Sequence, residues 1–348
     1  MRAVSLAVMR RRLALLAGIA LIAAGTAGAG DAKRPPAVTC QSDGMAGTAY
    51  VRGANCRQVL VDGYPRRYIV YVPTSPAIRL DRPLPVVFMF HGSSGSGEQF
   101  LKMSGWREQA ERVGLIAIFP TGAVYRVLDS GRRNTKWNDY TLPREVSLTE
   151  KPAGYPSAAP WPANDVKFTS SMLDDVSAGV KVDAKRVYVS GFSNGGAFCM
   201  RLAVELSNRI AAAGCVGGGL DADRSKLVKR RIPVYALTGN ADDKLAENIG
   251  VARLPLNAAE LVAIPRLGAR LALFVATFGL VNRYEETAGE GFVRLLYRTP
   301  QPGNRSGNTF RYQVLDGVTH QYPNGRNNPR GFVAARIFWD FFSRYPAR

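Results

Sequence analysis

The chain alternates between short, almost wholly apolar runs and stretches in which apolar residues recur every three or four positions. The short runs predict strands buried on both faces of a sheet, and the longer period predicts amphipathic helices. Strands are expected at residues 67–72, 86–90, 115–119, 186–190, 212–216, 234–237, 292–297 and 310–315. Helices are expected at residues 97–113, from 164 through 176, and at 196–203, 261–281 and 333–342. This alternation predicts one α/β domain on a doubly wound, mostly parallel sheet with helices on both faces.

The first residues have a different pattern. Residues 1–12 carry four arginines and no acid, residues 13–24 are almost wholly apolar, and Ala27-Gly28-Ala29 fits a cleavage site. We therefore expect a signal peptide at residues 1–29 and a secreted or periplasmic protein, with an uncleaved membrane anchor as the alternative. No membrane span is expected in the mature protein, because Pro265, Arg266 and Arg270 interrupt the other long apolar stretch.

Two further segments precede and interrupt the expected domain. Residues 30–65 are expected to be loop-rich, with a possible Cys40–Cys56 disulfide, and residues 66–348 to form the α/β domain. For Cys199 and Cys215, a bridge and buried free thiols are both open. Residues 121–163 are rich in Pro, Gly and aromatic residues, and we expect this long loop to form a wall of a substrate cleft, with Trp137 in contact with the substrate.

Charge and histidine content restrict the function. The formal net charge is +19, and removal of the four arginines of the expected signal peptide leaves +15. Such a surface attracts anions, but the basic residues are scattered and no nucleic-acid motif accompanies them, so no nucleic-acid partner is expected. His91 and His320 are the two histidines, which excludes a multi-histidine metal site. The run from Gly92 to Gly97 lacks the ending of a phosphate-binding loop, and no cofactor is expected.

One pentapeptide carries candidate chemistry. Gly191-Phe192-Ser193-Asn194-Gly195 lies between an expected strand and an expected helix. In a Gly-x-Ser-x-Gly turn of this kind, the serine is projected from a sharp bend and the glycines leave room for the backbone and for a base. Ser193 is therefore the candidate nucleophile.

A serine nucleophile needs a base, a carboxylate and N–H donors for the oxyanion. His320 follows the last expected strand and is the candidate base. Asp242 is preferred as the acid over Asp243, since both follow the strand that ends at Leu237. More remote acid candidates are Asp221 and Asp223. The backbone N–H groups of Ser93 and Asn194 are the expected oxyanion donors, because Ser93 follows His91-Gly92 at a strand end and Asn194 follows the nucleophile.

With these positions assigned, residues 66 to 345 resemble the secreted polyhydroxybutyrate depolymerase and feruloyl or acetylxylan esterase family of α/β-hydrolases. The resemblance rests on Phe90-His91-Gly92, Ser104-Gly105-Trp106, Trp137-Asn138-Asp139, Asn164 to Phe168, Val182-Asp183, Arg186 to Tyr188, Gly191 to Gly196 and Gly317 to Pro323. It implies the α/β-hydrolase fold, with Ser193 as nucleophile, His320 as base, and the N–H groups of Ser93 and Asn194 as the oxyanion hole. The family's His-Gly-Thr-x-Asp around the acid is replaced by Thr238-Gly239-Asn240-Ala241-Asp242, whose spacing still selects Asp242.

The function expected from these residues is hydrolysis of carboxylic esters through an acyl-enzyme, without a cofactor. The ester would come from a polyester oligomer, a hydroxycinnamate ester on polysaccharide or an acetylated sugar. Peptide-bond cleavage is a further enzymatic possibility. The alternative from another class is an exported, non-catalytic protein of the same fold that binds acidic polymers through its basic surface. Oligomeric state is not read from the sequence.

Overall fold

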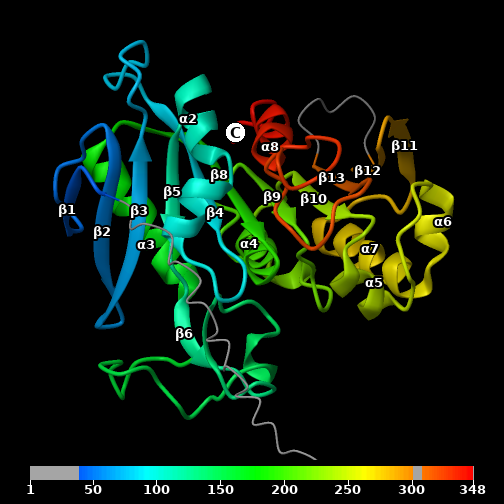
Figure 1. The fold of residues 1–348 in the computed structure, drawn as a ribbon, viewed down its shortest axis with the longest axis horizontal. Helices are drawn as coiled ribbons and strands as arrows, with labels where there is room; N and C mark the ends of the chain where they lie inside the picture. Colours follow the sequence, from blue (N-terminus) through cyan, green and yellow to red (C-terminus); the bar gives the residue numbers. More distant parts are fainter. Residues whose placement is uncertain (1–38, 301–307, 348) are drawn as a thin grey trace, which may run out of the picture. The chain divides into compact units, whose positions relative to one another are not determined.

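Eleven strands form the central sheet in the order β1-β2-β3-β5-β4-β8-β9-β10-β13-β12-β11 (Figure 1). The computed structural model describes residues 39–300 and 308–347, so the expected signal peptide at residues 1–29 lies outside the described residues. The strands of this sheet are β1 Ser42–Met45, β2 Gly53–Val61, β3 Tyr64–Val72, β4 Leu84–Phe90, β5 Ile116–Pro120, β8 Val182–Phe192, β9 Ala212–Val216, β10 Val234–Gly239, β11 Tyr284–Gly289, β12 Phe292–Arg298 and β13 Thr309–Leu315.

The centre of the sheet is parallel and most of its margins are antiparallel. Neighbouring strands from β5 through β4, β8, β9 and β10 to β13 are parallel. The β2, β3 and β5 neighbours and the β13, β12 and β11 neighbours are antiparallel. Parallel strands joined by helical crossovers bring their carboxyl ends to one edge, where the loops of an α/β-hydrolase site lie. The chain has the α/β-hydrolase fold.

Helices cover both faces of this sheet. They are α1 Gly97–Met103, α2 Trp106–Val113, α3 Asp165–Gly179, α4 Asn194–Glu205, α5 Asp243–Ile249, α6 Ala258–Ala263, α7 Pro265–Phe278 and α8 Ala334–Phe342. Alternate side chains of β4 enter different clusters: Phe88 and Phe90 belong to the cluster that includes residues of α3, α4 and α7, while Val87 and Met89 belong to the one that includes residues of α1, α2 and α8. The apolar runs of the sequence are apolar because both sides of each central strand are buried.

Two expected helices are each divided. Residues 97–113 break at Ser104-Gly105, where Gly105 has a φ of 79° and precedes the first residue of α2. Residues 261–281 break between Ile264 and Pro265: Ile264 is extended, and Pro265 begins α7, where its missing N–H costs no helical hydrogen bond. Apolar periodicity continues through both breaks, which is why the sequence predicted single helices.

The expected loop-rich segment at residues 30–65 contains two strands of the main sheet. β2 is nine residues long and pairs along its whole length with β3. Its pattern hides this because Asn55 and Arg57 are buried among apolar neighbours. Asn55 donates to the carbonyls of Val51, Gly53 and Val70, and Arg57 donates to backbone carbonyls including that of Ala49. These polar side chains satisfy buried backbone oxygens.

The expected long loop at residues 121–163 also has internal structure. A two-stranded sheet of β6 Ala123–Arg126 and β7 Arg133–Lys136 begins it. Its aromatic residues pack mainly on one another: the ring of Tyr125 lies 4.6 Å from that of Trp161, and Tyr155 joins the same cluster. Local packing therefore replaces regular secondary structure over much of this segment.

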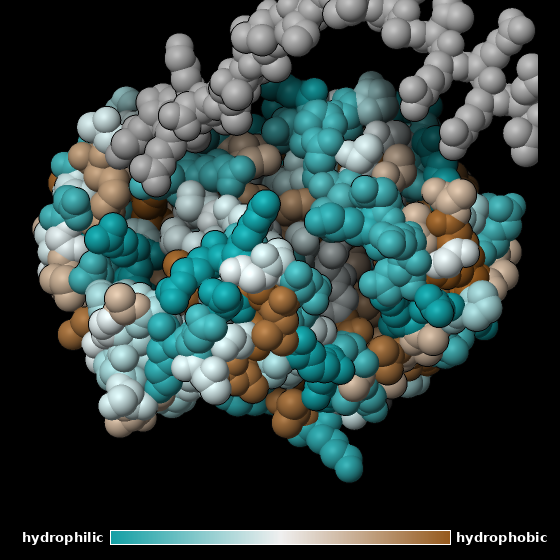
Figure 2. Space-filling view, turned by 60° about the horizontal axis from the view of Figure 1, so that its bottom comes forward, coloured by the Kyte–Doolittle hydropathy of each residue, from teal (hydrophilic) through white to brown (hydrophobic). Residues whose placement is uncertain are grey.

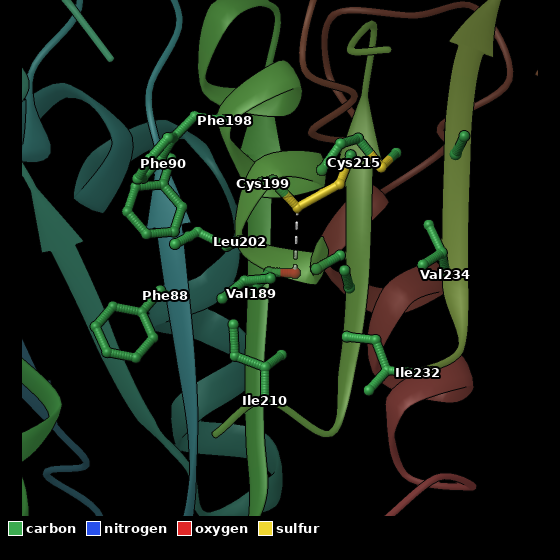
Figure 3. Close-up of a cluster of buried hydrophobic side chains, with 14 of the residues drawn as sticks. Phe88, Phe90, Val189, Phe198, Cys199, Leu202, Ile210, Cys215, Ile232 and Val234 are labelled. Carbon is green, nitrogen blue, oxygen red and sulfur yellow. Dashed lines mark hydrogen bonds between the residues drawn. A yellow bond between two sulfur atoms is a disulfide. The ribbon is translucent and has the colours of Figure 1, made fainter. Parts of the chain in front are cut away.

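Both cysteine pairs form disulfides, Cys40–Cys56 and Cys199–Cys215. The first joins the N-terminal segment to β2, as the sequence predicted. The second joins α4 to β9 and is fully buried among apolar side chains (Figure 3). The Cys199 sulfur lies 3.7 Å from the carbonyl oxygen of Val189. Since a disulfide sulfur carries no proton, this contact is van der Waals in the bridged form.

Within residues 39–300 and 308–347, no helix combines the length and apolar character needed to cross a membrane.

We expect the inner disulfide to contribute about 3 kcal/mol to stability, because it closes a loop of 16 residues in the unfolded chain. The Cys199→Ala/Cys215→Ala protein should show that loss in the free energy of unfolding, measured by urea titration. The matched comparison is Cys40→Ala/Cys56→Ala. Because this bridge has the same sequence separation of 16, loop closure alone predicts a similar loss of stability. A double variant at 199 and 215 as stable as the parent would contradict the expectation.

Candidate active site

Ser193 occupies a strained turn between β8 and α4. Its φ is 53° and its ψ is −121°, a combination that residues with a side chain rarely adopt. Its N–H donates to the carbonyl of Val216 on β9 at 2.9 Å. The turn needs glycine on both sides: a Cβ at Gly191 would lie 2.1 Å from the oxygen of Gly195, and one at Gly195 would lie 2.2 Å from the oxygen of His91. Close backbone packing therefore holds the serine at the carboxyl edge of the sheet.

The structure brings Ser193, His320 and Asp242 together. His320 Nε2 lies 2.9 Å from Ser193 Oγ, and His320 Nδ1 lies 3.0 Å from each carboxylate oxygen of Asp242. A carboxylate beside Nδ1 keeps the proton there, so Nε2 is the nitrogen that accepts from the serine hydroxyl. Asp242 is buried and His320 is largely buried. The arrangement is that of a hydroxyl, a base and an orienting acid.

Of the acid candidates, Asp242 is the one that the structure shows bonded to the imidazole. Asp243 is the exposed first residue of α5, whereas Asp242 is its N-cap and accepts from the N–H of Leu245 at 3.0 Å. Asp221 binds Arg144 and Arg224, and Asp223 accepts from Ser225. The geometry therefore favours Asp242.

Asn240 joins the loop of the acid to the loop of the base. Its side-chain oxygen accepts from the backbone N–H of Gly317 at 2.8 Å, and its side-chain NH₂ group donates to the carboxylate of Asp316 at 3.1 Å. At Gly239, an added Cβ would lie 1.8 Å from the carbonyl oxygen of Val318. These contacts hold the two loops together in a chain that has threonine at position 238. The role of Asn240 was not predicted, although it lies in the quoted motif.

Tyr322 anchors the loop of His320 from beneath. Its buried hydroxyl accepts from the indole N–H of Trp106 at 2.9 Å and lies 3.2 Å from Ser190 Oγ on the strand that leads to Ser193. Burial raises the pKa of Tyr322, so the hydroxyl stays neutral. The sequence contained both Trp106 and Tyr322 in family motifs, but only the fold shows that they meet.

His91 holds the loop that carries Ser93. It is fully buried, its Nε2 accepts from the N–H of Gly122 at 2.9 Å, and its Nδ1 lies 2.7 Å from the oxygen of Gly92. Because Nε2 accepts, Nδ1 carries the proton and donates to Gly92. Burial lowers the pKa of His91 to about 4. His91 is therefore a neutral positioning residue.

The two expected oxyanion donors come from different elements, Ser93 from the loop after β4 and Asn194 from the start of α4. Ser93 is the exposed second residue of a turn closed by the hydrogen bond from Gly95 N–H to Gly92. Asn194 begins α4, so its backbone N–H has no intrahelical acceptor. The Asn194 side chain accepts from the backbone N–H of Trp137 at 2.7 Å and donates to Asp139 at 2.8 Å. Residues 121–163 thus fix the first turn of this helix.

Trp137 is not placed where the sequence suggested. Its ring is fully buried, stacks 5.5 Å from that of Phe198 and meets Phe90 edge-on at 5.1 Å. Its indole N–H donates to the carbonyl of His91 at 2.9 Å. In this position it supports the site from behind and does not line the cavity, so a direct contact with substrate does not fit the structure.

A cavity of about 580 Å³ includes Ser193 and His320 in its lining. One part of its wall comes from the long segment and is polar: Lys136, Asp139, Thr141 and Glu145. Another part comes from α7 and is largely apolar, with Leu267, Leu271 and Phe274. The segment at 121–163 therefore does form a cleft wall, but with polar side chains instead of its aromatics.

One face of the molecule is shown with the bottom of Figure 1 turned forward; on this face hydrophilic residues predominate and hydrophobic ones are dispersed among them (Figure 2). Among the residues that the structure describes, no group of three or more His, Cys, Asp or Glu side chains is placed to hold a metal ion.

No protein-family model matches the chain. It is 29% identical over 188 residues to putative esterase NocK of Nocardia uniformis subsp. tsuyamanensis, covering 53% of this chain and 48% of that protein. It is 24% identical over 290 residues to feruloyl esterase D of Neurospora crassa, covering 82% of this chain and 84% of that protein. The chain is a relative of esterases.

A third relative is the bifunctional acetylxylan esterase/xylanase XynS20E of Neocallimastix patriciarum, 25% identical over 176 residues. The match spans 51% of this chain and 21% of that protein, so the chain matches about half the length of NocK and about a fifth of the length of XynS20E. Among solved structures, the acetyl xylan esterase from Aspergillus awamori aligns with a TM-score of 0.49 at 13% identity, covering 80% of this chain and 94% of that chain. The esterase names of the three sequence relatives agree with the resemblance drawn from the motifs.

Acid should destabilise the protein through His91. Its folded pKa of about 4 lies below the ordinary value of 6.5, so the unfolded chain takes up the proton first as the pH falls. The contribution of neutral His91 to the free energy of unfolding is fully retained above pH 6.5. It is lost as the pH falls from 6.5 to 4, and amounts to about 3 kcal/mol for a pKa shift of this size. Urea titrations near pH 7 and pH 4.5 should show a smaller loss for His91→Gln than for the parent. Equal losses in the two proteins would exclude His91 as the cause.

Proposed function

We propose that the protein is a serine esterase that hydrolyses carboxylic esters through an acyl-enzyme intermediate. The observation that carries the proposal is the hydrogen-bonded series from Asp242 through His320 to Ser193 beside the cavity, with separations of 3.0 and 2.9 Å. The names of the esterase relatives support the same reaction class.

In the proposed reaction, His320 Nε2 takes the proton of Ser193 as its Oγ attacks the ester carbonyl. The backbone N–H groups of Ser93 and Asn194 stabilise the negative charge that develops on the carbonyl oxygen. Asp242 stabilises the imidazolium, which then gives its proton to the departing alcohol. Water, deprotonated by His320, attacks the acyl-enzyme and releases the acid and Ser193.

The proposed substrate is an acylated polysaccharide or a polyester oligomer. An apolar wall suits an acyl group, and the polar wall of Lys136, Asp139, Thr141 and Glu145 suits the hydroxyl-rich alcohol portion of a sugar ester. Feruloyl, acetyl and hydroxybutyrate esters should be compared at equal concentration with the purified protein, and kcat/KM for each decides among them.

Export is part of the proposal. Two disulfides in the described chain fit an oxidising compartment, outside the cytoplasm. This agrees with the expected signal peptide at residues 1–29.

Ser193→Ala should lower kcat for a simple chromogenic ester by at least about 10⁴-fold, because the variant lacks the hydroxyl that His320 Nε2 contacts. Circular dichroism should remain that of the parent. A serine-reactive phosphonate should label the parent stoichiometrically at Ser193 and leave the variant unlabelled. A folded, active Ser193→Ala protein would defeat the proposal, and an unlabelled parent that binds acidic polymer in a salt-sensitive way would support the non-catalytic alternative.

Asp242→Asn should lower kcat by about 10⁴-fold, since an amide no longer fixes the imidazole tautomer. Its side-chain oxygen can still cap α5, so the fold should persist. The matched control is the adjacent Asp243→Asn, which should retain activity within about twofold because Asp243 is exposed and does not line the cavity. The reverse ranking, read from kcat, would move the acid to Asp243.

A further inference from the structure

A second cavity, of about 390 Å³, lies on the face of the sheet that α8 covers. Its cationic lining consists of Arg294 of β12, Arg311 of β13 and Arg344, which follows α8. We call it the arginine cavity. Gln313 and Asp340 complete its charged and amide lining, and aromatic side chains form most of the remainder.

The arginine cavity occupies strand positions where an apolar lining is normal. Arg294 is directly opposite Gln313 in the β12–β13 pair, and Arg311 is opposite Tyr235 in the β10–β13 pair. The intervening residue Tyr312 points to the other face and lines the candidate active-site cavity. Inward positions of a sheet covered on both faces are usually filled by hydrophobic residues. Apolar packing alone therefore does not account for two arginines and a glutamine here.

These arginines lack carboxylate partners. Within residues 39–300 and 308–347, Arg294, Arg311 and Arg344 form no ion pair, although Arg298 on the same strand as Arg294 pairs with Glu285 at 2.8 Å. Asp340 is exposed and likewise forms no ion pair in this part of the chain. Three positive charges thus face a single, unpaired negative one, which is unfavourable in a partly buried site.

The donors of the cavity are held in place. The guanidinium carbon of Arg311 lies 4.8 Å from the ring centroid of Phe341 and 5.7 Å from that of Tyr235, and its buried Nε has no acceptor. Gln313 is nine-tenths buried, and its carbonyl oxygen accepts from the Tyr235 hydroxyl, which leaves its amide N–H groups as donors. Burial lowers the pKa of Arg311; Tyr345 and Tyr235 act to raise it, and the charges of Arg294 and Arg344 act to lower it. A bound anion would reverse that effect.

We propose that the arginine cavity binds a small oxyanion, a carboxylate or a phosphate group. Planar guanidinium groups match the paired oxygens of such ligands, and the glutamine amide adds a neutral donor beside them. This site lies on the opposite face of the sheet from the Ser193 cavity and does not depend on the proposed esterase reaction.

Calorimetric titration with inorganic phosphate, at an ionic strength held constant with sodium chloride, tests the site. Saturable binding of one phosphate per chain is expected, together with a higher midpoint of thermal unfolding. Arg311→Gln and Arg344→Gln should each weaken phosphate binding by at least about tenfold. The matched control Arg298→Gln removes an exposed, ion-paired arginine of β12 and should leave phosphate binding unchanged.

Displacement of phosphate by glucuronate would assign the natural ligand to carboxylates, and failure to displace it would assign the ligand to phosphates. Turnover of a neutral chromogenic ester should be the same in Arg311→Gln, Arg344→Gln and Arg298→Gln. A loss of phosphate binding is therefore distinguishable from a loss of the proposed esterase activity at Ser193. If circular dichroism shows that Arg311→Gln does not fold, phosphate binding by the Arg344→Gln variant still tests the proposal, because Arg344 is exposed. Absence of saturable binding, or binding unchanged by both cavity variants, would overturn the proposal.

Discussion

The site depends on the sharp turn at Ser193, where three backbone segments meet with no space for side chains. Glycines before and after the serine let β8 and α4 come into contact with the end of β4, and the N–H of Ser193 binds β9. The unfavourable backbone angles persist because the surrounding sheet leaves no alternative path. The direction of the hydroxyl is therefore a property of the packed sheet, and the remaining groups are arranged around it.

Buried polar side chains then fix the three loops that converge on this turn. Tyr322 links the loop of His320 to the strand of the serine, Asn240 links that same loop to the one bearing Asp242, and His91 holds the loop of Ser93. Each of them satisfies groups that would otherwise be buried without a partner, and satisfied networks of this kind rigidify a structure. The geometry of Ser193, His320 and Asp242 is thus held largely by buried polar residues outside this group.

Local sequence signals predicted much of this arrangement. The central strands and the turn between strand and helix at Ser193 followed from apolar runs and turn chemistry, and the structure agrees with them. Spacing selected Asp242 as the acid, and the structure places it beside His320, while its role stays a prediction. The strand β2 was missed because buried Asn55 and Arg57 break its apolar pattern, and Trp137 was misplaced because composition cannot distinguish an aromatic in a cleft from one beneath it. Contacts such as Trp106 with Tyr322 join residues 216 positions apart, and no local pattern encodes them.

Asp242 makes two contacts at once, with His320 and with the first turn of α5. The carboxylate that meets the imidazole also caps α5, the helix that contributes Lys244, Leu245 and Asn248 to the cavity wall. Remodelling that wall to admit a different ligand would disturb the acid, whereas the open side of Gly219 can accept a side chain without touching its neighbours. The ligand preference of the cavity can therefore be changed more freely by substitution at Gly219, which lines it, than by substitutions in α5.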